Sequence, residues 1–196
     1  MEACENYQKQ SYRNRCRILT ANGVEALNVP VVHENGTYSL PVRTIRIDYS
    51  TPWVLRTERA IESAYSSSPF FIYYKDALFA ILDSHPVTLW ELNRRLLDFF
   101  CTKIGIAPDI RETSEFVAPN DAAGCEQEYG QGQTVSDLSD DYRQLIHPKR
   151  PNTILADLGL CRPYWQVFRD RFGFVPNLSI MDLLFNEGPE SICWLR

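Results

Sequence analysis

The segment RNRCRILTANGVEALNVPVV, residues 13–32, predicts the β-hairpin on which the fold is built. Arginines alternate with other residue types along its first half, which is the two-residue period of a strand. Asn22-Gly23 predicts the tight turn, because both residue types tolerate positive φ. Pro30 indicates that the returning strand lies at an edge or ends there. A second turn at residues 34–36 and a third strand in TIRIDYS, residues 44–50, are expected to follow.

Helical patterns begin after this strand-rich region. Residues 53–66 and 73–84 carry apolar side chains at helical spacing. A third helix begins at Thr88, which forms a capping-box pattern with Glu91, and Gly105 is a natural C-terminal stop. We therefore predict three consecutive helices.

The remaining chain is less regular. Residues 110–117 predict a short strand, and the acidic, glycine-bearing stretch 117–141 predicts a mobile loop. A short helix is expected from Pro163 to Gly173, and a last helix within residues 176–191. In that last helix Ser179 is the expected cap, Asp182 sits at the third position and Gly188-Pro189 ends it. Strands followed by helices indicate an α/β or α+β class, as a single mixed-sheet domain over residues 1–196.

Composition excludes some functional classes. The chain has 196 residues and a net charge of −5, which argues against general nucleic-acid binding, because that requires a basic surface. No apolar run is long enough to span a membrane and no leader is evident, so we expect a cytoplasmic protein without membrane insertion. The cysteines form no CxxC pair and are expected to be reduced thiols: Cys4, Cys16, Cys101, Cys125, Cys161 and Cys193.

Known catalytic motifs are missing from the sequence. It contains no phosphate-binding, dinucleotide-binding, zinc-protease or GxSxG motif, so we assign no cofactor and expect no metal site. His33, His85 and His147 lie in or near predicted turns, and we interpret them as solvated loop residues.

The best candidate for a site is the polar cluster ENYQKQSYRNRCRIL at residues 5–19. Its tyrosines offer rings and hydroxyls, and its arginines offer planar donor forks that suit carboxylate and phosphate. Such a set could hold an anionic ligand such as a sugar nucleotide or an acyl donor. The alternative, that these side chains form a solvated strand face, stays open from the residues alone.

The C-terminal carboxylates Asp182, Glu187 and Glu190 are the second candidate group. One of them could supply a base. The alternative is structural, because the first turn of a helix favours a carboxylate at the position of Asp182.

Three segments together resemble the WbqC-like family. They are the run Tyr7-x-Lys9-x-x-Tyr12-x-Asn14-Arg15-x-Arg17-Ile18, the pair Pro52-Trp53 followed by AIESAYSSSPFF at residues 60–71, and PNLSIMDLLFNEGPES at residues 176–191. Their order is that of the family, and the chain is similar to its short members from Bacteroides-like bacteria. The resemblance implies a place in surface-polysaccharide biosynthesis of the O-antigen type, possible transfer of an acyl or aminoacyl group from a small-molecule donor to a sugar acceptor, and a ligand site at Tyr7, Lys9, Asn14, Arg15, Asp182 and Asn186. A non-catalytic, degenerate or accessory binding member is the alternative.

Two departures from the family pattern affect these expectations. Family members usually begin with a strand and a segment like QPxYFPxxxYF, so we expect that Met1 is an internal methionine and that the sheet lacks its first strand. Thr57 stands where the family often has a histidine. If that histidine is a general base, this chain lacks it, and no catalytic residue is assigned.

Overall fold

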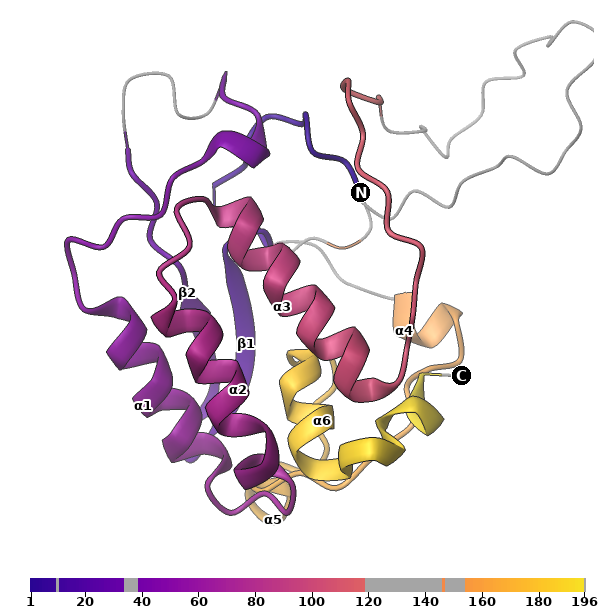
Figure 1. Cartoon of the computed structure of the whole chain (residues 1–196). Coiled ribbons are helices and arrows are strands. Elements are labelled where there is room, and N and C mark those ends of the chain that lie inside the picture. Colours follow the sequence, from indigo (N-terminus) through magenta and orange to yellow (C-terminus); the bar gives the residue numbers. More distant parts are fainter. Residues whose placement is uncertain (10, 34–38, 119–145, 147–153, 196) are drawn as a thin grey trace, which may run out of the picture.

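The computed structural model describes residues 1–9, 11–33, 39–118, 146 and 154–195 (Figure 1). Within them, one β-hairpin lies behind a layer of three helices, and shorter helices from the C-terminal part of the chain close the lower end (Figure 1). The α+β class is confirmed. The sheet of the described residues is a two-stranded antiparallel pair, so the expected mixed sheet was wrong for this part of the chain.

The hairpin consists of β1, Arg15–Thr20, and β2, Gly23–Asn28. Its register runs from Arg15 opposite Asn28 to Thr20 opposite Gly23. The turn therefore comprises Ala21 and Asn22, one position earlier than predicted. Gly23 alone carries the positive φ of this turn, 108°. Such a glycine directly after a two-residue turn matches the strong right-handed twist of a hairpin.

The predicted third strand does not form a ladder. Residues 42–44 make a short 3-10 helix, Val42–Thr44. Beyond it, Ile47 forms an isolated antiparallel bridge with Val31, and Arg46 forms one with Thr88. The expected alternation is present, because Ile47 is buried and Arg46 is exposed, but the backbone partners change from one residue to the next. The second turn, at 34–36, lies outside the described residues.

The three predicted helices are confirmed as α1, Trp53–Tyr65, α2, Phe71–Asp83, and α3, Leu89–Ile104. The hydroxyl of Thr88 accepts a hydrogen bond from the backbone N–H of Glu91. Gly105 ends α3 with a left-handed φ of 84°. Local capping signals therefore located both ends of this helix correctly.

Two shorter elements were predicted wrongly. Residues 110–117 form no strand. Instead the N–H of Thr113 donates to the backbone carbonyl of Met1, and the N–H of Val117 donates to the side-chain carboxylate of Glu2. The helix expected over 163–173 is reduced to α5, Arg169–Phe172, after a short α4, Ile154–Asp157.

Tertiary hydrogen bonds explain the shortened helix. The side chain of Gln166 both accepts from the N–H of Val175 and donates to its carbonyl, each at 2.9 Å. The N–H of Trp165 donates to Glu187 at 3.1 Å. These partners hold the segment before α5 in an irregular path, which local propensity cannot foresee.

The last helix is α6, Ile180–Glu187, capped by the hydroxyl of Ser179 as predicted. Gly188 ends it with a φ of 57°, and a 3-10 helix, Gly188–Trp194, continues the chain. A β-carbon on Gly188 would lie 2.5 Å from the ring of Phe70, so both the backbone conformation and the space require glycine here.

Two apolar cores stabilise the fold. The first packs α1, α2, α3 and α6 around residues such as Tyr65 and Phe185. The second packs the N-terminal segment against α1 and α3 and includes Tyr7, Trp53 and Leu92. The second core matters for function, because it fixes the positions of Tyr7 and Trp53 beside the hairpin.

Candidate functional site

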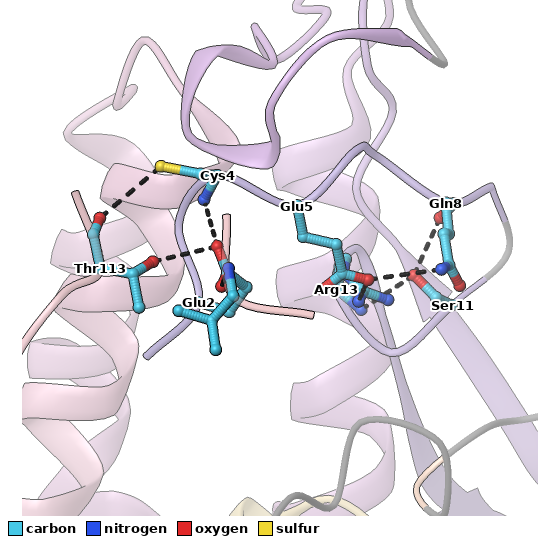
Figure 2. Close-up of polar contacts among 8 residues, drawn as sticks. Glu2, Cys4, Glu5, Gln8, Ser11, Arg13 and Thr113 are labelled. Carbon is cyan, nitrogen blue, oxygen red and sulfur yellow. Dashed lines mark hydrogen bonds and ion pairs between the residues drawn. The ribbon is translucent and has the colours of Figure 1, made fainter. Parts of the chain in front are cut away.

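The polar cluster at the start of the chain is folded into a compact loop (Figure 2). Glu5 and Arg13 form an ion pair that joins the two ends of the segment 5–13. Within it, Ser11 donates to the carbonyl of Gln8 at 2.9 Å, and the Gln8 side chain donates to Glu5 at 3.3 Å. Arg13 therefore has a structural role and does not line the pocket formed by the other predicted residues of this cluster.

The two predicted residues of this loop occupy different environments. Tyr7 is 3% exposed and packs in the second core, and its N–H donates to the carbonyl of Leu40 at 3.0 Å. Lys9 is exposed. Both residues line one pocket. The buried ring thus supplies a rigid wall, and the lysine supplies a mobile charge above it.

Asn14 and Arg15 reach the same pocket from the start of β1. The side-chain N–H of Asn14 donates to the carbonyl of Val29 at 3.0 Å, and the Arg15 Nε donates to Asn28 at 2.8 Å. Each side chain is thus held by the returning strand, and within the described residues only the Nε of the Arg15 guanidinium has a hydrogen-bond partner, which leaves its other N–H groups to a ligand.

The pocket lies between the hairpin, its continuation and α1, with a volume of 580 Å³. This size suits a small molecule. The structure brings four of the six predicted site residues together here, and Thr57, at the position of the family histidine, lines the pocket with them. The lining residues are Tyr7, Lys9, Asn14, Arg15, Glu25, Ala26, Leu27, Asn28, Val29, Pro30, Val31, His33, Asp48, Thr51, Trp53, Arg56, Thr57 and Ala60.

Positive charge prevails in this pocket despite the acidic chain. Lys9, Arg15 and Arg56 face two carboxylates, Glu25 and Asp48. The net charge of the whole protein is −5. A local excess of cations in a concave site attracts an anionic ligand and orients its charged group.

His33 and Asp48 both line the pocket and are close enough for their charges to interact, which sequence reasoning missed. The bridge between Val31 and Ile47 brings these segments together. The pKa of Asp48 is lowered, chiefly by the N–H and hydroxyl of Ser50 and to a lesser extent by the charge of nearby His33. His33 is exposed, as expected of a solvated residue, yet it lines the pocket beside a carboxylate that is kept ionised.

Two buried polar atoms at the pocket have no hydrogen-bond partner among the described residues. They are the side-chain oxygen of Asn14 and the indole Nε1 of Trp53. Trp53 is only 5% exposed. A buried unpaired donor or acceptor costs about 1–3 kcal/mol, so a ligand that pairs them would recover part of that free energy.

Asp182 and Asn186 lie elsewhere and do not line the pocket. Asp182 is 1% exposed and accepts hydrogen bonds from Tyr164 at 2.7 Å and Gln166 at 2.9 Å. Asn186 donates to the backbone carbonyl of Asp182, one turn earlier in α6, at 2.7 Å. These contacts tie α6 to the irregular segment before α5. A ligand role for the pair stays a prediction.

Burial raises the pKa of Asp182, and the hydrogen bonds from Tyr164 and Gln166 only partly oppose this effect. Burial and the neighbouring carboxylate raise the pKa of the Tyr164 hydroxyl. The tyrosine hydroxyl therefore stays protonated and donates a hydrogen bond to the Asp182 carboxyl group. Such a hydrogen-bond network can hold the end of a helix in place.

Other site classes find little support in the described residues. No group of three or more histidine, cysteine or acidic side chains is placed to hold a metal ion there. Cys4, Cys16, Cys101, Cys161 and Cys193 are free thiols, and Cys125 lies outside the described part. No helix in the described ranges is long and apolar enough to cross a membrane. The predicted loop at 117–141 falls almost wholly outside these ranges.

Few sequence signals point to the pocket residues that were not predicted. Arg56 and Thr57 lie one turn after Trp53 on α1, so the Pro-Trp pair was an available pointer to the first turns of this helix. No spacing rule links His33 to Asp48, because a single bridge between distant segments joins them.

Comparisons with known proteins agree with the resemblance seen in the sequence. The family model of WbqC-like proteins matches residues 1–148. The chain is also similar to the uncharacterized protein Rv1507c of Mycobacterium tuberculosis, with 32% identity over 97% of this chain and 84% of that protein. No solved structure was found to match.

Proposed function

The chain belongs to the WbqC-like protein family, and from this premise we propose that its pocket binds the anionic donor of a group-transfer reaction. The transferred group would be an acyl or aminoacyl group, and the acceptor a sugar of an O-antigen-type surface polysaccharide. Lys9 and Arg15 would hold the phosphate or carboxylate of the donor, and Tyr7 and Asn14 would position it.

The observation that supports this proposal best is the convergence of cations in one pocket. Lys9, Arg15 and Arg56 come from three separate elements, the N-terminal loop, β1 and α1, and line the same 580 Å³ volume. Glu25 and Asp48 line the same pocket and offset two of these three charges, so one positive charge remains in excess. A bound anion would balance it.

The same pocket offers an acid–base pair for the transfer step. Asp48 has a lowered pKa and stays ionised, and its carboxylate beside His33 can orient the imidazole ring. In the proposed reaction the neutral imidazole of His33 would accept the proton of the attacking sugar hydroxyl, the hydroxyl oxygen would bond to the acyl carbon, and the anionic remainder of the donor would leave with the electron pair of the broken bond. This assignment compensates for Thr57, which cannot act as a base at neutral pH. Asp182 and Asn186 would support the fold.

Thermal unfolding with a donor panel tests the binding step. Suitable probes are UDP-N-acetylglucosamine, acetyl-coenzyme A and inorganic pyrophosphate. A ligand present at about 100 times its Kd stabilises the folded state by about 2.7 kcal/mol, and this raises the Tm of a chain of this size by about 5–10 °C. Arg15→Ala should reduce the rise by about half to nine-tenths, because it removes a charged hydrogen-bond donor worth about 1.5–3 kcal/mol.

Arg17→Ala is the matched control. Arg17 lies two residues further along β1 and does not line the pocket. The Arg17→Ala variant should keep the ligand-induced shift in Tm. Equal shifts in both variants would contradict the assigned role of Arg15, and no shift of the unmodified protein with any probe would contradict the proposal as a whole.

Thr57 favours a second candidate, a binding protein without catalytic activity. Thr57 lines the pocket at the position where the family often has a histidine. In that case the donor would raise the Tm, but no group would be transferred to a sugar acceptor. A transfer assay on the unmodified protein separates the two candidates, because only an enzyme transfers the group. A His33→Gln variant, which should still bind the donor, then tests the role of His33 in the transfer.

A further inference from the structure

An apolar cavity adjoins the proposed donor pocket. It has a volume of 150 Å³ and extends between the hairpin, α1, α2 and α3. Its lining combines apolar side chains, among them Ile61, Leu78, Leu82, Leu96 and Phe100, with polar ones that include Arg13, Arg15 and Asn93. An apolar cavity of about this size accepts a six-carbon apolar molecule.

The two cavities share one wall. Asn14, Trp53 and Thr57 line both of them. A single ligand can therefore place a charged group among the cations of the first cavity and an apolar group in the second. The shared wall would then face the atoms that join these two groups.

The unpaired polar atoms lie on residues of this shared wall. Trp53 Nε1–H is a donor without an acceptor, and the Asn14 side-chain oxygen is an acceptor without a donor, as far as the described residues go. One donor and one acceptor complement an amide, whose carbonyl accepts and whose N–H donates. Both atoms are shielded from solvent in the free protein, so a ligand reaches them only through a side-chain adjustment, which is common on binding.

Cys16 does not change the apolar character of the second cavity. Burial raises the pKa of its thiol to about 11. The group is therefore a neutral thiol at physiological pH and behaves as a small apolar side chain.

We propose that the 150 Å³ cavity is an acyl-chain subsite, and that the ligand is an anion joined through an amide to an acyl group of up to about six carbons. The inference rests on the proposed function and names the substrate class of the same site. In the complex, the Trp53 indole donates to the amide carbonyl, and the amide N–H donates to the Asn14 side-chain oxygen.

Calorimetric titration with N-acetyl-, N-butyryl- and N-hexanoylglycine tests the proposal. These probes keep the carboxylate and the amide and differ only in chain length. Each methylene buried in an apolar site improves affinity about fourfold. The hexanoyl compound should thus bind on the order of 100-fold more tightly than the acetyl compound.

Two variants test the parts of the assignment separately. Trp53→Phe keeps the ring and loses the donor, so it should weaken all three probes by about 3–10-fold without changing the dependence on chain length. Trp90→Phe is the control, because Trp90 packs beside the second core and lines neither cavity. It should leave all affinities unchanged. Equal losses in both variants would overturn the role of the Trp53 indole.

The outcomes separate this inference from the proposed function. If the acetyl compound binds and longer chains add nothing, the acyl subsite is refuted while the anion site stands. If no probe binds, the acyl subsite is refuted, while the anion site is decided separately by thermal unfolding with the donor panel. A crystal structure of the protein under xenon pressure provides an independent measurement: a xenon atom in the cavity supports an apolar subsite, whereas ordered water in its place overturns it.

Discussion

Replacing Gly188 by alanine should destabilise the protein strongly, for two separate reasons. The φ of Gly188 is 57° with a ψ of −131°, a conformation that residues with a β-carbon avoid at a cost of about 1–3 kcal/mol. The new β-carbon would also lie 2.5–2.7 Å from three atoms of the Phe70 ring. Overpacking of this kind costs about 1–3 kcal/mol more.

The Phe70 ring cannot simply withdraw from this contact. Its own N–H donates to the carbonyl of Phe185 at 3.0 Å, which fixes the backbone of Phe70 against α6. The two terms together predict a loss of about 2–6 kcal/mol in the free energy of unfolding, a large part of the 5–15 kcal/mol typical of a folded domain. Urea denaturation followed by circular dichroism measures this loss.

Gly173→Ala is the control for the backbone term alone. Its φ is 69°, but a β-carbon there meets no atom within 4 Å. The difference between the two variants should therefore equal the steric term of about 1–3 kcal/mol. The double variant Gly188→Ala with Phe70→Leu should recover part of that difference. Equal losses for Gly188→Ala and Gly173→Ala would refute the reasoning from the Phe70 contact.

Three further predictions concern the cap, the buried carboxylate and the N-terminal loop. Thr88→Ala should lower the free energy of unfolding by about 1 kcal/mol in urea denaturation, because the N–H of Glu91 loses its acceptor, whereas Thr88→Ser should be nearly neutral. Because the pKa of Asp182 is raised in the folded state, its contribution to stability falls as pH rises from about 4 through the folded-state pKa. Asp182→Asn should remove this part of the pH dependence of the free energy of unfolding. If that free energy changes with pH between 4 and 7 in the same way for both proteins, the prediction is wrong. Glu5→Gln should lower the free energy of unfolding by about 1–3 kcal/mol, since it leaves the half-buried Arg13 without its carboxylate. It should also weaken the binding of anionic probes, although Glu5 does not line the pocket. An unchanged affinity would contradict the positioning role of the loop.

Local signals predicted those parts of the fold that local chemistry determines. The alternation in residues 13–20 and the glycine at 23 located the hairpin, and the Thr88 and Ser179 caps located two helix starts. Predictions were wrong where distant partners decide the backbone path. Residues 44–50 looked like a strand but find only isolated bridges, and Gln166 draws its segment out of helical geometry.

The same division applies to the candidate site. Tyr7, Lys9, Asn14 and Arg15 lie within nine consecutive positions, so their clustering could be seen in the sequence. The rest of the pocket could not be predicted, because the fold brings it from the segments 25–33 and 48–60. The grouping of Asp182 with the opening cluster came from a family pattern, and the pattern cannot distinguish a ligand contact from a buried structural carboxylate.

The long reach of the N-terminal segment has a consequence for how the molecule is made. Ala3 donates to the Thr113 hydroxyl at 3.0 Å, and Glu2 accepts from Thr113 and Val117, although more than a hundred residues separate the partners. Contacts across such sequence separation form late, because the intervening chain must first be ordered. On the ribosome, the hairpin and the first helices can assemble while Glu2 and Ala3 still wait for residues 113–117 to emerge. The start of the chain is thus fixed last, whereas every residue that lines the donor pocket lies before residue 61 and is synthesised well before those partners.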